Sequence, residues 1–214
     1  MTTTWLTHNR VQLALHTIRA TDGPALLLLH GLGESSPAEV PAFAAAWTGS
    51  IHALDFTGHG ASTLPVGGGY TAELLMADAD LAVQALGEAT IVGRGLGAYI
   101  GLLIAGARAD KVRGAVLADG PGISGGAAAP TSQPVVHAEG VDSTPDPFAI
   151  IELGRDLRPA DYATNFVRLA NEGSTLAEPI TVTTRFPPQW LEAVSAEPGV
   201  RTAASIAEAL QAYP

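Results

Sequence analysis

The sequence predicts an α/β protein with a doubly wound, mostly parallel sheet, and two observations support this fold class. Strand-like apolar runs alternate with helix-length segments between about residues 24 and 119, a pattern that produces right-handed βαβ crossovers. The run over residues 24–30 is continuously apolar, as expected for a strand covered on both faces. The length of 214 residues fits one domain, residues 1–214, in which we expect a reduced lid insertion of about residues 121–177.

The elements before this insertion follow from their periodicity. Apolar and polar residues alternate around Trp5 and again from Val11 to Ile18, which indicates two half-buried strands. We predict the remaining elements in chain order: strand 24–30, a short helix ending near Trp47, strand 50–55, helix 71–86, strand 89–93, helix 96–107 and strand 112–119.

The insertion begins with a Gly/Ala/Pro-rich loop at 121–134 and continues with two short helices over 147–171. In the second helix, Tyr162, Phe166 and Leu169 fall on one face at helical spacing. We expect this face to close the domain's own core, with a second copy of the chain, in a homo-oligomer, as the alternative partner. The chain then returns as a strand over 179–186, helices around Trp190 and Ile206, and a final strand around Val200.

The composition excludes several classes of function. Eleven basic and 21 acidic residues give a formal charge of −10, which repels nucleic acids and anionic membranes. The chain has no cysteine and no His-x-x-x-His pair, so we expect no metal and no cofactor. A helix that crosses a bilayer needs about 20 apolar residues, and the most apolar stretch, residues 98–107, has half of that length. Residues 1–10 do not resemble a signal peptide. We expect a cytoplasmic protein.

Three motifs carry chemistry, and each follows a predicted strand. They are His30-Gly31, Asp55-Phe-Thr-Gly58-His59-Gly60 and Gly93-Arg94-Gly95-Leu96-Gly97. As a set in this order they resemble the α/β-hydrolase family, in which the third is the G-x-S-x-G nucleophile elbow. The resemblance covers residues 27–119 well and the remainder weakly. It implies an α/β-hydrolase fold.

The catalytic triad that the resemblance implies is degenerate. Gly95 occupies the position of the nucleophile, and the guanidinium of Arg94 cannot replace a hydroxyl. The family's histidine follows the last strand, but residues 138–214 contain no histidine and only His137 follows the elbow. Asp119 is the candidate acid. Two independent losses predict a pseudoenzyme, because loss of a triad member lowers the rate by several orders of magnitude.

The resemblance also assigns a vestigial oxyanion hole to the backbone N–H groups of Leu32 and Leu96. We expect these amides to form a ligand pocket for a small acyl or carboxylate compound beneath the lid. The residues assigned to this pocket are His30, Gly31, Leu32, Arg94, Gly95 and Leu96. His59 is interpreted as a structural histidine of its glycine-rich turn.

Two alternatives remain open at this point. A rearranged hydrolase or lyase would use Asp119 with a displaced His137 or His59, helped by a lid carboxylate such as Glu139, Asp142 or Asp146. The glycines at 93–97 also resemble a dinucleotide fingerprint with Asp119 downstream, but they depart from G-x-G-x-x-G by one residue and lie in mid-chain. We therefore prefer a noncatalytic binding or protein-association role.

Overall fold

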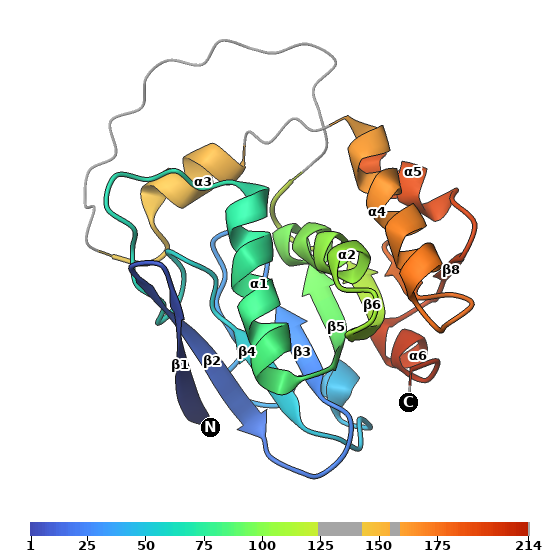
Figure 1. Ribbon diagram of the computed structural model, residues 1–214, viewed down its shortest axis with the longest axis horizontal. Helices are drawn as coiled ribbons and strands as arrows, with labels where there is room; N and C mark the ends of the chain where they lie inside the picture. Colours follow the sequence, from blue (N-terminus) through green and yellow to red (C-terminus); the bar gives the residue numbers. More distant parts are fainter. Residues whose placement is uncertain (124–142, 155–158, 214) are drawn as a thin grey trace.

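The structure is a computed structural model that describes residues 1–123, 143–154 and 159–213. Its centre is an eight-stranded sheet in the order β1-β2-β4-β3-β5-β6-β7-β8, shown in Figure 1. β1 and β2 form an antiparallel hairpin, β2 is also antiparallel to β4, and all pairs from β4 to β8 are parallel. The predicted fold class is confirmed.

The strands match the predicted order. Their bounds are β1 Thr2–His8, β2 Val11–Arg19, β3 Leu26–Leu29, β4 Ile51–Leu54, β5 Ala89–Arg94, β6 Val112–Ala118, β7 Ile180–Thr183 and β8 Val200–Thr202. The helices are the 3-10 turn η1 Ala42–Ala44, α1 Ala72–Leu86, α2 Leu96–Ala107, α3 Pro147–Leu153, α4 Ala160–Gly173, α5 Gln189–Ser195 and α6 Ile206–Leu210. The short helix expected near Trp47 is therefore reduced to the three residues of η1, which Pro41 precedes.

The central strands are buried on both faces, as their unbroken apolar runs require. In β3, Leu27 and Leu29 join a core with α1, α2, α4 and α5, whereas Leu26 and Leu28 join a second core with η1 and α6. All four leucines are at most 5% exposed. In Figure 1, α1 and α2 lie across the near face of the sheet. The second face has much less helical cover between β3 and β4, because their connection contains only η1.

Helix α4 packs against α2 and the larger core. Its buried residues are Ala163, Thr164, Val167 and Ala170, and Gly106 of α2 lies so close that a Cβ there would be 2.6 Å from the Phe166 carbonyl oxygen. Tyr162 and Phe166 pack partly buried against the same core. Leu169 is 47% exposed, so the prediction was wrong for this residue: the small alanines, not Leu169, form the contact face. A lid role for residues 121–177 stays a prediction.

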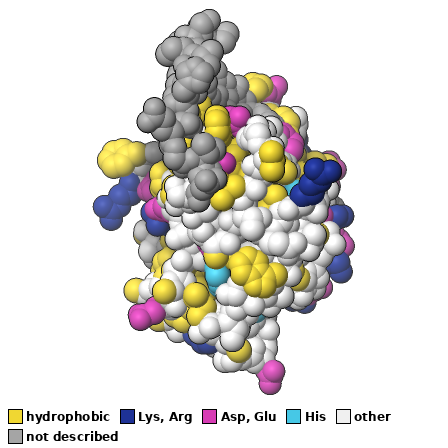
Figure 2. Space-filling view, turned by 90° about the vertical axis from the view of Figure 1, so that its left-hand side faces the viewer, with side chains coloured by type: hydrophobic (Ala, Val, Ile, Leu, Met, Phe, Trp, Pro, Cys, Tyr) yellow, Lys and Arg dark blue, Asp and Glu magenta, His cyan; other side chains and the backbone are white. Residues whose placement is uncertain are grey.

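The face that carries the N-terminal hairpin shows no concentration of one charge. In Figure 2, acidic, basic and hydrophobic side chains are interspersed over the described part of this face. Among the described residues, no helix combines the length and apolarity needed to cross a membrane.

Candidate functional site

The corner between β5 and α2, which the resemblance assigns to the nucleophile elbow, has a glycine at its tip. Gly95 is the residue before α2 and has φ 52° and ψ −113°, a conformation that favours glycine. A Cβ at Gly93 would lie 2.1 Å from the Gly97 carbonyl oxygen, and one at Gly97 would lie 2.2 Å from the Leu29 carbonyl oxygen. Strand and helix therefore approach each other at a distance that only glycine allows, as the motif predicted.

The loop after β6 fills the space above this corner. The backbone N–H groups of Leu32 and Leu96 both donate to the carbonyl oxygen of Pro121, each at 2.9 Å. These are the two amides that the sequence assigned to the oxyanion hole. The Pro121 carbonyl thus occupies the position expected for a ligand oxygen.

The same loop excludes a side chain at the elbow. A Cβ on Gly95 would lie 2.2 Å from the Pro121 carbonyl oxygen and 2.4 Å from the carbonyl carbon of Gly120. In this structure the chain itself therefore satisfies the amides of Leu32 and Leu96, and a ligand pocket at these residues stays a prediction. No sequence motif predicts the contact of Pro121 with these amides, because a backbone carbonyl makes it.

Several contacts hold this loop in place. The Asp119 carboxylate accepts from the Arg185 backbone N–H at 3.0 Å, which ties β6 to the residues after β7. The Trp190 indole donates to the Ile123 carbonyl at 2.9 Å, and its ring lies edge-on to Tyr99 of α2. The loop is therefore anchored before and after Pro121.

His30 and Arg94 point away from the elbow. The Nδ1 of His30 lies 2.7 Å from the Gly31 carbonyl oxygen, and its Nε2 accepts from the Phe56 backbone N–H at 3.1 Å. Burial, and then the neighbouring His59, lower the pKa of His30 to about 4, so this histidine is neutral near pH 7. Arg94 is half-exposed and lies beside Glu34, with 3.4 Å between Nη1 and Oε1.

His59 is a fully buried part of its turn. Its Nδ1 lies 3.1 Å from the Thr57 carbonyl oxygen, and its ring packs against His30 at 5.0 Å between centroids. Burial lowers its pKa, so the ring is neutral at pH 7. This environment agrees with the structural interpretation of His59. His137 lies outside the described residues.

Two His–Asp pairs, one buried and one partly buried, were missed by the sequence analysis. His16 Nε2 lies 3.0 Å from Asp55 Oδ2, and His8 Nδ1 lies 2.6 Å from Asp78 Oδ1. Both join the N-terminal hairpin to the body of the protein across 39 and 70 residues. The signal for the second pair was a carboxylate within the apolar face of α1, where Asp78 lies among Leu75, Ala79 and Ala82.

The two carboxylates also bind backbone N–H groups. Asp55 accepts from Ser36 and Ala61, each at 2.7 Å, and Asp78 accepts from Thr57 at 2.9 Å. Burial alone would raise the pKa of Asp55, but hydrogen bonds from Ala61, His16 and Ser36 outweigh it and lower the pKa. For Asp78 burial dominates and raises the pKa. Both pairs organise the chain around residues 55–60.

The described residues contain no group of three or more His, Cys, Asp or Glu that could hold a metal ion. Two hollows adjoin the elbow. One of about 190 Å³ lies between Gly95, Asp119 and Trp190. The other, of about 400 Å³, lies between β3, β5 and residues 34–43, on the far side of Arg94.

Comparison with known proteins places this geometry in a family. The family model described as the alpha/beta hydrolase family matches residues 26–213, which is most of the chain. The chain belongs to this family. No curated protein sequence is detectably similar to it.

Two solved structures share the fold over most of this chain. A hydrolase from Pseudomonas aeruginosa PA01 is 19% identical, with a TM-score of 0.57 over 94% of this chain and 89% of that one. A membrane phospholipase A described as a bacterial virulence factor is 16% identical, with a TM-score of 0.57 over 94% of this chain and 77% of that one. The thioesterase domain from the curacin biosynthetic pathway is 25% identical, but the match spans only 55% of this chain and 46% of that domain, with a TM-score of 0.48.

The resemblance of the sequence motifs to this family assigns the nucleophile elbow to the corner at Gly95. The backbone of the elbow is present, and the residue at its tip has no side chain. After β8, where the resemblance places the histidine, the chain reads Ala203-Ala204-Ser205. Asp119 remains at the end of β6, where its carboxylate binds a backbone amide.

Proposed function

We propose that this protein is a noncatalytic member of the alpha/beta hydrolase family that acts by binding a small acyl or carboxylate ligand. The observation that supports the noncatalytic part of this proposal is the Pro121 carbonyl, which accepts the N–H groups of both Leu32 and Leu96. The binding part is supported by the hollow of about 400 Å³ on the far side of Arg94. Acyl transfer requires these donors to face a developing oxyanion, and it requires a nucleophile within reach. Gly95 supplies no nucleophile, and the amides already have an acceptor.

The rearranged-enzyme alternative has less support from the described residues. The Asp119 carboxylate binds the Arg185 N–H, and His59 is fully buried with its Nδ1 at the Thr57 carbonyl. Asp146 accepts from the Tyr70 hydroxyl at 2.6 Å and caps α3 through the Phe148 N–H. Each group that this alternative needs from the described residues already has a structural role.

The test combines a fluorophosphonate probe with a panel of p-nitrophenyl and thioester substrates, using an active serine hydrolase in parallel. We expect no covalent labelling and no turnover above that of buffer. Saturable turnover would contradict the proposal. If Asp119→Asn then abolished it, the rearranged enzyme would replace the noncatalytic protein.

A protein-association role is the second form of this proposal. Phe186 is 88% exposed and Leu169 is 47% exposed, so the described surface retains large apolar side chains on the side of α4 and β7. The mass in solution, measured by light scattering over a range of concentrations, distinguishes a monomer that binds small ligands from a homo-oligomer.

A further inference from the structure

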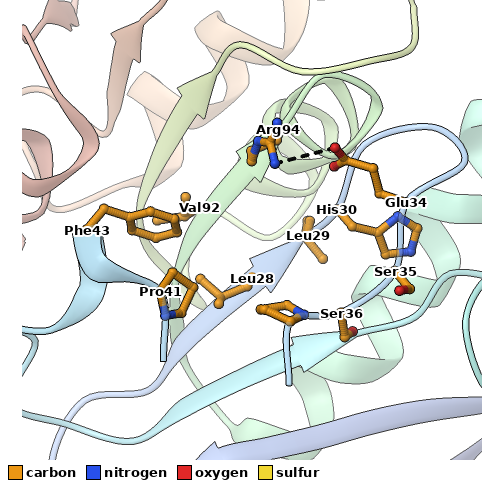
Figure 3. Close-up of a pocket in the computed structure, with 11 residues that line it drawn as sticks. Leu28, Leu29, His30, Glu34, Ser35, Ser36, Pro41, Phe43, Val92 and Arg94 are labelled. Atoms are coloured by element: carbon orange, nitrogen blue, oxygen red, sulfur yellow. Dashed lines mark ion pairs between the residues drawn. The ribbon is translucent and has the colours of Figure 1, made fainter. Parts of the chain in front are cut away.

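The larger hollow beside the elbow lies on the face of the sheet that helices leave partly uncovered. Its floor is formed by Leu28 of β3 and Val92 of β5, and Pro41 and Phe43 form one wall. Figure 3 shows Arg94 and Glu34 together at one rim and the apolar side chains across the floor. The hollow exists because the chain between β3 and β4 forms only η1 at this place. We call it the Arg94 pocket.

The volume and lining of the Arg94 pocket suit a small organic molecule. At about 400 Å³ it falls within the range of roughly 300–1,000 Å³ typical of ligand sites, whereas the hollow between Gly95 and Trp190 has about 190 Å³. Such sites combine apolar walls with a few polar groups that fix the orientation of the ligand. In the Arg94 pocket, Leu28 and Val92 supply the apolar floor, and Glu34 and Arg94 supply the polar groups at the rim.

The hydrogen bonds at the rim favour an anion over a cation. Glu34 has both oxygens engaged, one by the Gly31 backbone N–H at 3.0 Å and the other by Arg94 at 3.4 Å. Arg94 uses only its Nε, which donates to the Asp119 carbonyl at 3.3 Å, and Nη1, which faces Glu34. Within the described part of the chain no acceptor is bonded to Nη2. A guanidinium has five donors, so this one keeps donors for a carboxylate.

We propose that the Arg94 pocket binds a small amphipathic carboxylate, with its apolar body on Leu28, Val92 and Phe43 and its carboxylate on the Arg94 guanidinium. The proposal rests on the binding role proposed above and moves the site from the elbow amides to the other side of Arg94. It does not depend on whether the elbow is catalytic.

The test is isothermal titration of the full chain with phenylacetate and octanoate, with phenylacetamide as the neutral counterpart of phenylacetate. We expect saturable binding of the two carboxylates and at least tenfold weaker binding of the amide. Arg94→Gln should weaken carboxylate binding at least tenfold. Glu34→Gln should strengthen it about threefold, because it removes the competing charge while keeping an acceptor for the Gly31 N–H.

Arg113→Gln is the matched control, since Arg113 is another half-exposed arginine paired with a glutamate, Glu88, but lies at the opposite end of the strands. This variant should bind like the wild type. Phe43→Ala should weaken octanoate binding severalfold and tests the apolar wall independently of charge. Circular dichroism verifies that each variant is folded.

Equal binding of the amide and the carboxylate would overturn this proposal. So would equal loss in Arg94→Gln and Arg113→Gln, or no saturable binding by the folded protein. These results would leave the noncatalytic role untouched if the fluorophosphonate probe still failed to label the protein. Covalent labelling together with Arg94-dependent carboxylate binding would overturn the noncatalytic role and support the Arg94 pocket.

Discussion

The elbow corner and the turn at residues 55–60 are two family motifs with opposite outcomes. At the elbow corner, the position that the resemblance assigns to a nucleophile carries no side chain: Gly95 has φ 52° and lies beneath the Pro121 carbonyl. At the turn, by contrast, ionisable side chains are abundant and buried, with Asp55 and His59 at most 2% exposed. The buried Asp and His side chains, which most resemble catalytic groups, thus form hydrogen bonds that stabilise the turn.

The reason lies in what each region needs. Around the turn, the backbone N–H groups of Ser36 and Ala61 point into the interior and need an acceptor there. The buried carboxylate of Asp55 accepts both of them. The elbow amides find their acceptor in a neighbouring backbone carbonyl instead. A buried His–Asp pair in this protein therefore indicates a stabilised loop. Whether a group can act in catalysis has to be judged from the hydrogen-bond partners that it already has.

The largest expected effect comes from the turn. Asp55→Ala should lower the free energy of unfolding by about 3–5 kcal/mol, because it leaves the Ser36 and Ala61 N–H groups and His16 without their acceptor in the interior. Urea denaturation measures the change. The control is Asp80→Asn, which removes the charge of a carboxylate that pairs with Arg108 and is more exposed than Asp55; it should cost about 0.5 kcal/mol. Equal costs would show that the turn does not depend on this carboxylate.

At the elbow corner, adding a side chain is expected to lower the stability of the protein. Gly95→Ser should destabilise the protein by about 2–4 kcal/mol, because a Cβ meets the Pro121 carbonyl and Gly95 has positive φ, and it should produce no esterase activity. Gly87→Ser is the matched control: Gly87 has φ 82° but open space around its Cβ position, so only the backbone term of about 1 kcal/mol remains. If Gly95→Ser folded normally and hydrolysed esters, the loop would not block the corner.

A pH series sharpens the comparison, because His30 lies between the two regions. Unfolded His30 takes up a proton below about pH 6.5, and in the folded protein its pKa is about 4, so stability falls as the pH decreases through this window. We expect a loss of about 2 kcal/mol from His30 between pH 7 and pH 5. The dependence should flatten in His30→Gln and flatten less in His52→Gln, whose half-buried ring also has a lowered pKa. Identical slopes in wild type and His30→Gln would refute this assignment.

The smallest effect is expected at Asp119. Asp119→Asn keeps an oxygen that accepts the Arg185 N–H, and the site is exposed, so the free energy of unfolding should change by less than about 1 kcal/mol. Ligand binding in the Arg94 pocket should also persist, since Arg94 contacts the Asp119 backbone carbonyl and not its carboxylate. A large loss of ligand binding or of an enzymatic activity in Asp119→Asn would contradict this prediction and show that the Asp119 carboxylate has a functional role.

The fold could be predicted largely from the sequence because its signals are local. The α2 helix begins at Leu96 and ends at Ala107 as predicted, since glycine precedes it and apolar residues fill it. The crowding at Gly93 and Gly97 also followed from the motif. The contacts of the site could not be predicted in the same way. The His8–Asp78 pair joins residues 70 positions apart, and the Pro121 contact is made by a backbone atom that every residue has.

The bridging Pro121 carbonyl has a consequence for how such a corner can change over generations. A single codon change can replace Gly95 by serine, but the new side chain would meet a loop already seated on both amides. Accommodating that side chain would require the segment after β6 to be rebuilt in the same lineage. Substitutions at position 95 and in the loop after β6 are thus coupled through one peptide oxygen.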